Sequence, residues 1–258
     1  MSLWLAGHQK RFCYRGVMSN SSKSTPKVPL KVLYEDNHLL VIDKPAPLAT
    51  MGAEAGQPSL AEMAKDYLRV KFKKPGNVYV GVVSRLDAFV TGVIVLARTS
   101  KAASRLTDQF RRRSVEKTYW AMVADPLPDQ AGTLEHHIFK NDARHRMEVA
   151  VRRDQLPADA KLARLKYRVI ASYQNHSLVE VKLETGRKHQ IRVQFESIDC
   201  PILGDRKYGS EVPFKQGIAL HSRFLSIDHP TKRERFEFES EPPSAWRVER
   251  FKFYGDDS

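Results

Sequence analysis

Apolar and polar positions along the chain predict more strands than helices. In residues 31–45, KVLYEDNHLLVIDKP, two apolar runs flank a polar turn and predict a strand pair that ends at Lys44-Pro45. Continuous apolar runs at residues 79–83 and 93–97 are typical of buried strands. Alternating or extended patterns predict further strands at 118–123, 163–172, 177–184, 218–228 and 235–239. Because several of these strands are neighbours in the chain, antiparallel pairing is favoured.

Helical spacing of apolar residues occurs in fewer segments. Ser59 is expected to cap a helix whose apolar positions recur at helical spacing from residue 60 to residue 68. A basic helix follows, with one apolar face formed by Ala103, Leu106 and Phe110. Two more helices are predicted, at 191–197 and 243–251. The combination predicts an α+β fold in which helices flank a mixed, largely antiparallel β-sheet.

The chain divides into a short arm and one longer unit. Residues 1–29 contain basic but no acidic side chains and include a Ser- and Pro-rich stretch, which predicts a flexible basic N-terminal arm. Such a composition is also found in transit peptides, and translation could instead begin at Met18. Residues 30–258 are expected to form a single domain. Within it, the polar stretch at about 125–162 is interpreted as an insertion with one short strand at 147–151.

Composition and charge narrow the classes of protein that fit. The 258 residues include 43 Lys and Arg against 30 Asp and Glu, a net charge of +13 that favours a polyanionic partner such as nucleic acid. No apolar run approaches the ~18 residues of a membrane helix. Cys13 and Cys200 lack CxxC spacing, which excludes a disulfide framework and suits a reducing compartment. No metal site is expected, because the adjacent His136 and His137 would face opposite ways in a strand.

The segment VVSRLDAFVTGVIVLA places an aspartate between two buried strands. Asp87 lies in a short loop, with Arg85 two residues before it and Gly92 at the end of the turn. A carboxylate near a sheet interior is costly unless a cation or several donors face it. Two interpretations stay open for this segment alone: a structural aspartate that caps a loop, and a reactive carboxylate.

The segment LETGRKHQIRVQ brings many hydrogen-bond donors together after a glycine that ends a strand. Its donors are Arg187, His189, Gln190 and Arg192. If a helix begins near His189, Arg192 lies on its first turn and can point inward, where a guanidinium needs a carboxylate such as Asp87. Alternatively, both arginines belong to a solvated face.

Two other segments carry weaker indications. In RRRSVEKTYWAMV, residues 111–113 form a basic cluster that suits a helix C-terminus and could also bind phosphates. Tyr119 then falls on a strand, where an aromatic side chain more often belongs to the core. In ILGDRKYGS, Asp205 and Tyr208 are expected to be turn and packing residues.

Six blocks together resemble the RluA-type RNA pseudouridine synthases in order and spacing: LYEDNHLLVIDKP, SRLDAFVTGVIVLA, EKTYWAMV, TGRKHQIRV, PILGDRKYG and ALHSRFLSI. The resemblance extends from about Leu30 to about Pro230. It implies a pseudouridine synthase fold with a central RNA-binding cleft. It also implies an isomerase that converts specific uridines of structured RNA, ribosomal or transfer, to pseudouridine without a cofactor. Such enzymes are expected to be cytoplasmic monomers with no obligate protein partner, or organellar ones if residues 1–29 are a transit segment.

The resemblance also implies roles for individual residues. Asp87 corresponds to the essential aspartate of the family, which either adds to the sugar or removes a sugar proton. Arg192 would keep it charged, and Tyr119 would stack on the uracil and relay the C5 proton. Arg85 would enter the space left by the flipped nucleotide or contact its phosphate. The expected RNA- or substrate-binding residues are Arg85, Thr91, Arg187, His189 and Gln190.

Two departures from the family pattern and two alternative functions accompany this prediction. Ser84 stands where the family usually has His, and Val90-Thr91-Gly92 stands where it usually has Thr-Ser-Gly. Neither change removes Asp87, Tyr119 or Arg192, and the change from His to Ser is expected to alter base flipping or RNA choice and not the isomerisation. The alternatives are a catalytically inactive RNA-binding relative and a glycosidase- or nucleosidase-type hydrolase. A hydrolase of that type usually needs two carboxylates about 5–10 Å apart.

Overall fold

The structure, a computed structural model, describes most of the chain. The described residues are 29–53, 57–124, 127–152, 154–215 and 217–254. The predicted N-terminal arm, residues 1–29, lies outside them except for Pro29. None of the helices in these ranges is long and apolar enough to cross a membrane.

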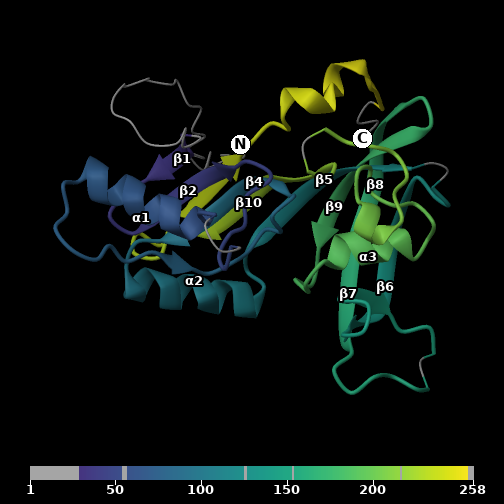
Figure 1. Cartoon of the computed structure of the whole chain (residues 1–258), viewed down its shortest axis with the longest axis horizontal. Coiled ribbons are helices and arrows are strands. Elements are labelled where there is room, and N and C mark those ends of the chain that lie inside the picture. Colours follow the sequence, from purple (N-terminus) through teal and green to yellow (C-terminus); the bar gives the residue numbers. More distant parts are fainter. Residues whose placement is uncertain (1–28, 54–56, 125–126, 153, 216, 255–258) are drawn as a thin grey trace, which may run out of the picture.

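One mixed sheet contains the strands of the described residues and runs across the molecule (Figure 1). Its main order is β1 (Lys31–Glu35), β2 (Leu39–Lys44), β4 (Thr91–Ala97), β10 (Leu220–Asp228), β5 (Glu116–Ala124), β9 (His176–Leu183), β8 (Lys161–Tyr173), β6 (Ala131–Asn141) and β7 (Arg146–Val149). Three short strands extend it: β3 (Gly81–Val82), β11 (Arg235–Glu239) and β12 (Lys252–Phe253). Only the β4–β10 pairing is parallel among these strands. The predicted class, a mixed and largely antiparallel sheet with helices, is confirmed.

Three α-helices are present in the described residues: α1 (Leu60–Lys71), α2 (Ser100–Arg112) and α3 (Gln190–Glu196). Ser59 begins α1 as predicted, because its hydroxyl accepts a hydrogen bond from the backbone N–H of Glu62. The Glu62 carboxylate in turn accepts one from the Ser59 N–H at 2.7 Å, which completes a capping box. In Figure 1, α1 and α2 accompany β1, β2, β4 and β10, whereas α3 lies beside β6 to β9.

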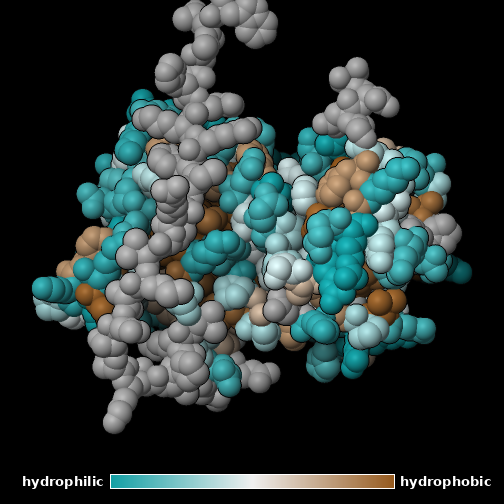
Figure 2. Space-filling view, turned by 90° about the horizontal axis from the view of Figure 1, so that it is seen from above, coloured by the Kyte–Doolittle hydropathy of each residue, from teal (hydrophilic) through white to brown (hydrophobic). Residues whose placement is uncertain are grey.

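The two long helices explain why β2 and β4 are apolar on both faces. Leu40 and Ile42 pack in one cluster with Leu60 of α1, whereas Leu39 and Val41 pack in another with residues of α2. A strand covered on both faces has no solvent-exposed side and therefore reads as a continuous apolar run. Outside the core, hydrophilic side chains cover most of the face seen from above, with apolar residues in scattered patches (Figure 2).

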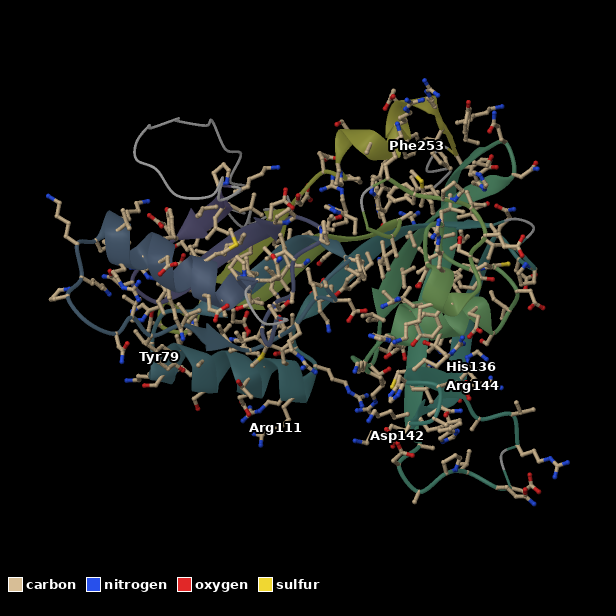
Figure 3. All side chains as sticks on the ribbon, in the orientation of Figure 1. Tyr79, Arg111, His136, Asp142, Arg144 and Phe253 are labelled. Carbon is tan, nitrogen blue, oxygen red and sulfur yellow. The ribbon has the colours of Figure 1, made fainter. Side chains whose placement is uncertain are left out.

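The predicted strand at 79–83 is much shorter in the structure. Only Gly81 and Val82 pair, and they pair with the last two residues of β4. β10 pairs with the same edge of β4, but only at Thr91 and Gly92, and β3 pairs with that edge at the other end of β4. Tyr79 is 48% exposed and lies at the periphery near α2 (Figure 3). The prediction of a buried strand over the whole segment was therefore wrong.

The polar stretch at 125–162 contains more regular structure than predicted. In addition to β7, it holds β6, whose 11 residues pair with β8 and then with β7 as a hairpin. Only Leu134 and Ile138 of β6 are buried, so its apolar pattern is too sparse to indicate a strand. The segment at 243–251 is also different, because Arg247 has φ 51° and separates two short 3₁₀ turns, Ser244–Trp246 and Val248–Arg250.

Candidate active site

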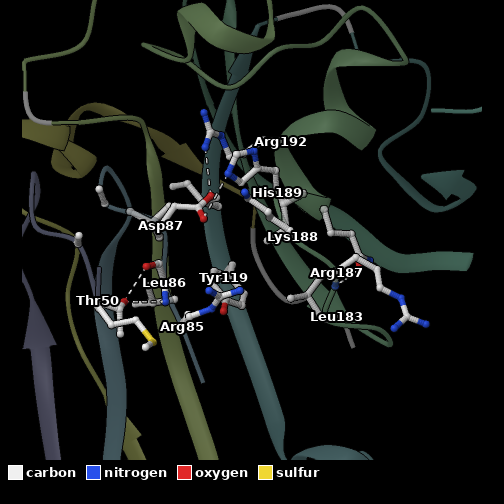
Figure 4. A pocket seen from close by; sticks show the side chains of 18 residues that line it. Thr50, Arg85, Leu86, Asp87, Tyr119, Leu183, Arg187, Lys188, His189 and Arg192 are labelled. Atoms are coloured by element: carbon white, nitrogen blue, oxygen red, sulfur yellow. Dashed lines mark hydrogen bonds and ion pairs between the residues drawn. The ribbon is translucent and has the colours of Figure 1, made fainter. Parts of the chain in front are cut away.

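A cavity of about 330 Å³ lies between the loop that carries Asp87, the middle of β5 and the turn before α3 (Figure 4). Seven of the eight residues proposed from the sequence line it: Arg85, Asp87, Tyr119, Arg187, His189, Gln190 and Arg192. These residues come from segments more than 30 positions apart in the chain. The structure therefore brings the two donor-rich sequence segments and the strand aromatic to one place.

The loop that carries Asp87 is held in place by backbone hydrogen bonds on both sides of the aspartate. The Thr50 hydroxyl donates to the Leu86 carbonyl at 2.7 Å and accepts from the Leu86 N–H at 3.2 Å (Figure 4). After the aspartate, the Ala88 carbonyl accepts from the Leu48 N–H at 2.9 Å. The segment after β2 therefore fixes the position from which Asp87 enters the cavity.

Lys44 helps to hold the loop of Asp87 in place, and the sequence interpretation missed it. It is fully buried, and its ammonium donates to the carbonyls of Pro45, Leu48 and Ala88 at 3.0, 2.8 and 3.2 Å. Burial lowers the pKa of Lys44 to about 7, although attraction from Asp87 opposes this change. Strand alternation could have identified it, because Lys44 shares a face of β2 with the core residues Leu40 and Ile42.

Gly92 allows β4 and β10 to approach closely behind this loop. It has φ 107°, and a Cβ atom there would lie 2.3 Å from the Ser222 carbonyl oxygen. Ser222 pairs with Tyr119 on the other side of β10. A larger residue at position 92 would therefore push β4 away from β10, and so move the loop of Asp87 away from Tyr119 on β5.

Thr91 is the predicted binding residue that the structure does not bring to the cavity. It is 3% exposed, and its hydroxyl lies 2.8 Å from His221 Nδ1. His221 Nε2 donates to the Ser240 carbonyl at 2.8 Å, so Nδ1 of the neutral ring accepts from Thr91. Burial lowers the pKa of His221 to about 4 and keeps the ring neutral. The prediction that Thr91 contacts the substrate is therefore corrected, because its hydroxyl already bonds to His221 within the core.

Arg192 is shared between two carboxylates. Its Nη1 donates to Asp87 Oδ2 at 3.1 Å (Figure 4). Its Nε and Nη2 donate to Asp205 at 2.6 and 2.8 Å. Burial opposes the charge of Arg192, but the hydrogen bonds and attraction of the two aspartates raise its pKa overall. Asp205 lies in a turn as expected, because its carbonyl accepts from the backbone N–H groups of Tyr208 and Ser210. That expectation was incomplete, because its side chain, only 1% exposed, is also the bidentate partner of Arg192.

Tyr208 connects this arginine to the rest of the site. It lies in a 3₁₀ turn, η1 (Arg206–Tyr208), and its ring lies between the guanidinium groups of Arg146 and Arg192, 4.7 and 4.8 Å from its centroid. Its hydroxyl accepts from the Met147 N–H at 3.1 Å and lies 2.8 Å from His189 Nδ1. The predicted packing role is therefore incomplete, because the hydroxyl also bonds to two neighbouring elements.

His189 faces the second oxygen of Asp87. Its residue has φ 54° just before α3, and its Nε2 lies 3.6 Å from Asp87 Oδ1. Burial lowers the pKa of His189 to about 4, so the ring is neutral near pH 7. The Tyr208 hydroxyl accepts from Met147 and also shares a hydrogen bond with His189 Nδ1, which fixes the orientation of the imidazole ring.

Tyr119 forms the floor of the cavity below Asp87 (Figure 4). The side chain is 8% exposed, and burial raises the pKa of Tyr119 to about 12, although a hydrogen bond with Ser222 acts in the opposite direction. The phenol is therefore protonated at neutral pH. It presents an uncharged aromatic ring next to an ionised carboxylate.

The two other predicted residues of the turn before α3 have different surroundings. Gln190 is buried; its side-chain oxygen accepts from the Thr185 hydroxyl at 2.7 Å and from the Arg187 N–H at 3.0 Å. Its amide nitrogen donates to the Arg164 carbonyl at 3.0 Å, so Gln190 fixes the turn. Arg187 donates from Nε to the Leu162 carbonyl at 3.1 Å and directs its guanidinium away from Asp87 (Figure 4). Arg85 is exposed at the mouth of the cavity.

The described residues contain one carboxylate in the lining of this cavity, Asp87. They also contain no group of three or more His, Cys, Asp or Glu side chains that could hold a metal ion. Chemistry in this cavity therefore depends on a single acid, a guanidinium bonded to it and an aromatic ring.

Comparison with known proteins gives consistent matches. Residues 38–197 match the family model described as RNA pseudouridylate synthase. The chain is 36% identical over 235 residues to the ribosomal large subunit pseudouridine synthase D of Pseudomonas aeruginosa, a match that covers 84% of this chain and 69% of that protein. It is 34% identical over 233 residues to an uncharacterized RNA pseudouridine synthase of Aquifex aeolicus, with 85% and 72% covered.

Solved structures are similar as well. The human RNA pseudouridylate synthase domain containing 4 superposes with a TM-score of 0.70 at 25% identity, covering 87% of this chain and 95% of that one. The human RNA pseudouridylate synthase domain containing 1 has a TM-score of 0.68 at 24% identity, covering 86% and 87%, and supports the fold.

Proposed function

Because the chain belongs to the RNA pseudouridylate synthase family, we propose that the cavity around Asp87 isomerises uridines of large-subunit ribosomal RNA. The activity is that of an RNA pseudouridine synthase, an isomerase. The choice of RNA is supported by several relatives that are named for the large ribosomal subunit. The cavity is proposed as the site because it joins the charged pair of Asp87 and Arg192 with the ring of Tyr119.

The reaction sets three requirements for such a site. It breaks the bond between C1′ and N1, turns the uracil over, and joins C1′ to C5 with loss of the C5 proton. No electrons are exchanged. A carboxylate is needed beside the anomeric carbon, a pocket must retain the detached base, and the C5 proton must be removed.

Asp87 supplies the carboxylate in this proposal. Arg192 binds Oδ2 and stabilises the ionised form. No hydrogen bond within the described residues reaches Oδ1, since the distance of 3.6 Å to His189 is too long for one. Oδ1 is therefore the oxygen that is available to the ribose, either to attack C1′ or to remove a sugar proton.

Tyr119 holds the base in this proposal. An aromatic face is the usual partner of an unstacked RNA base, and the ring of Tyr119 lies at the floor of the cavity. With a pKa of about 12, the phenol cannot take up the C5 proton at neutral pH before it gives up its own. Proton removal through Tyr119 therefore requires its hydroxyl proton to pass first to a base, and the neighbouring Ser222 hydroxyl is too weak a base to keep that proton.

The alternative functions account less well for these contacts. A retaining or inverting glycosidase needs a second carboxylate, and Asp87 is the one acid in the described cavity lining. Asp205 is nearby but lies behind Arg192 with its side chain 1% exposed. An inactive RNA-binding relative would not need a buried arginine held between two aspartates.

The state and location of the enzyme are also part of the proposal. We propose that it acts as a monomer in the cytoplasm, as the family resemblance implies. The chain has only two cysteines, Cys13 and Cys200, and this low number suits a reducing compartment. Light scattering during gel filtration should give the mass of a single chain, and a dimer mass would contradict this part.

The decisive experiment maps pseudouridine in RNA treated with the purified chain. In vitro transcribed large-subunit ribosomal RNA, small-subunit ribosomal RNA and bulk unmodified transfer RNA are incubated separately with the wild type and with Asp87→Asn. We expect pseudouridine at specific positions of the large-subunit RNA with the wild type only. Modification confined to transfer RNA would refute the proposed substrate, and equal product with Asp87→Asn would refute the proposed site.

A further inference from the structure

A second groove, of about 940 Å³, adjoins the catalytic cavity. It extends from the mouth of that cavity to the C-terminal end of α2 and is bounded by β5 and β9. Arg85, Tyr119, Gly186 and Arg187 line both spaces. The catalytic site therefore opens directly into this groove.

The groove has an excess of positive charge. Its cationic lining residues are Arg85, Arg111, Arg113, Lys117, Lys182 and Arg187. Its two acidic residues form ion pairs with arginines that do not line the groove. Glu116 binds Arg235 at 2.9 Å, and Glu184 binds Arg164 at 3.1 Å. Arg111 pairs with Asp108 and Lys182 lies 3.9 Å from Glu180, both outside the groove lining. The remaining cations have no carboxylate partner within the described residues, and an anionic ligand would neutralise them.

Lys117 is the most distinctive of these cations. It is half-buried on β5, and among the described residues no carboxylate, carbonyl or hydroxyl pairs with its ammonium. The ammonium lies over the ring of Phe110, 5.6 Å from the centroid. Burial lowers the pKa of Lys117, as expected for a cation that has lost water without gaining an anion. A buried ammonium without an anion raises the free energy of the folded protein, and the binding of an anion offsets this cost.

The position of Lys117 relates it to the catalytic residues. Lys117 and Tyr119 are two residues apart on β5 and therefore face the same side of the sheet, about 6.6 Å apart along the strand. Gly186 lies opposite, and a Cβ atom there would be 3.5 Å from the Lys117 ammonium. The absence of a side chain at Gly186 leaves the ammonium accessible from the groove.

We propose that this groove binds the nucleotide next to the target uridine and that Lys117 binds its phosphate. The inference rests on the proposed function, because it assumes RNA whose target base lies on Tyr119. The apolar part of the groove includes Phe110 and Phe224, which offer surface for a base or a ribose. Lys117 is thereby assigned to RNA binding and not to the chemistry at C1′.

The test compares Lys117→Met, which keeps the aliphatic chain and removes the charge, with Lys101→Met as a matched control. Lys101 is an exposed lysine at the opposite end of α2. Affinity for a labelled fragment of in vitro transcribed large-subunit ribosomal RNA is measured by fluorescence anisotropy at several salt concentrations. We expect Kd to rise roughly tenfold or more for Lys117→Met, and not for Lys101→Met. The slope of log Kd against log salt should decrease by about 0.7–1.

Two further measurements separate a phosphate contact from a structural role. Lys117→Arg should restore most of the affinity, and kcat of Lys117→Met at saturating RNA should stay near the wild-type value. A methylphosphonate, an uncharged linkage, is then placed on either side of the mapped uridine. At one of these linkages it should weaken binding by the wild type and have no further effect on Lys117→Met.

The outcomes that overturn the inference are distinct from those that refute the proposed function. Unchanged Kd and salt slope in Lys117→Met, with thermal unfolding equal to that of the wild type, would exclude a phosphate contact. If that variant does not fold, Gly186→Leu covers the ammonium from the opposite side and should raise Kd in the same way; an unchanged Kd there would also overturn it. A wild type that binds this RNA without modifying it would refute the proposed function, while the Lys117 comparison would still decide the role of the groove.

Discussion

The two sides of the catalytic cavity are built in different ways. On one side, which we call the anchored wall, Arg192, Asp205, Tyr208 and His189 are buried and bonded to one another. The other side adjoins the second groove, and we call it the open wall. There the side chains of Arg85, Arg113 and Lys117 have no hydrogen bond or ion pair within the described residues. Groups that satisfy one another fix a geometry, whereas unpaired cations are available to bind phosphates.

This difference predicts two kinds of mutational effect. Substitutions on the anchored wall should lower both the free energy of unfolding and the rate, because they leave buried polar groups without partners. Substitutions on the open wall should leave stability nearly unchanged and should weaken RNA binding in a salt-dependent way. The following predictions test that division, beginning with the largest expected effect.

Asp87→Asn should reduce pseudouridine formation by at least about 1,000-fold, because the amide has no charge to act at the ribose. RNA affinity and thermal stability should stay close to those of the wild type. Product is measured by mass spectrometry of digested RNA, and affinity by anisotropy. If the variant lost its affinity together with its activity, Asp87 would belong to binding and the division would not hold.

Arg192→Ala should destabilise the fold by about 3–5 kcal/mol, because Asp205 and Asp87 lose the cation between them. Activity should be lost as well. Arg192→Lys keeps the charge but cannot donate to both carboxylates in the same plane, so it should recover part of the stability. Denaturant unfolding gives these values. A fully stable Arg192→Ala would show that the anchored wall does not depend on this residue.

Stability should fall as the pH decreases from about 6.5 to about 4. The folded-state pKa values of His189 and His221 are both lowered to about 4, below the unfolded value near 6.5. In this range the unfolded chain binds protons that the folded chain does not, so each histidine contributes a loss of up to roughly 1.4 kcal/mol per pH unit. Urea unfolding at pH 7, 6 and 5 measures the slope.

The control for this pH dependence is His189→Gln, which should flatten the slope by the contribution of one group. A variant of an exposed histidine, His145→Gln, should leave the slope unchanged. A slope equal to that of the wild type in His189→Gln would contradict the assignment of a buried, neutral ring to the anchored wall.

Tyr208→Phe should lower stability by roughly 1–2 kcal/mol, because the Met147 N–H and His189 Nδ1 both lose their partner. The ring remains between the two guanidinium groups, so the packing is preserved. We expect kcat to fall several-fold and KM for RNA to change little. A rise in KM with unchanged kcat would place Tyr208 functionally with the open wall.

Arg85→Ala should have the smallest effect on stability, within about 0.5 kcal/mol, because the side chain is exposed. The expected effect is a weaker RNA complex with a smaller dependence on salt. Thermal unfolding and salt-dependent anisotropy check both parts. A loss of stability comparable with that of Tyr208→Phe would remove the distinction between the two walls.

The parts of the fold that could be predicted depend on local patterns. The capping of α1 by Ser59 and the buried runs of β2 and β4 follow from residues that are close in the chain. β6 could not be predicted, because only Leu134 and Ile138 in its 11 residues face the core. Its identity as a strand depends on pairing with β8, which a local pattern does not contain.

The site shows the same limit. The segments of Asp87 and Arg192 offered their pairing as one of two interpretations, whereas Tyr119 was assigned to the site only by the family resemblance, which contains long-range information that a single pattern lacks. Asp205 was interpreted as a turn residue because its neighbours include glycine, and only the fold brings it to Arg192. Lys44 was overlooked because a lysine at the end of a strand usually reaches solvent, whereas this one meets three carbonyls.

The sharing of Arg192 between two aspartates has an electrostatic consequence. One guanidinium facing two carboxylates leaves this trio with a net charge of −1, while His189 beside it is neutral. Around Asp87 the carboxylates therefore outnumber the one guanidinium that binds them, whereas the other charged side chains of the cavity lining, Arg85, Arg187 and Lys188, are cationic. The cationic lining attracts the RNA backbone, and the excess of carboxylates disfavours a phosphate next to Asp87.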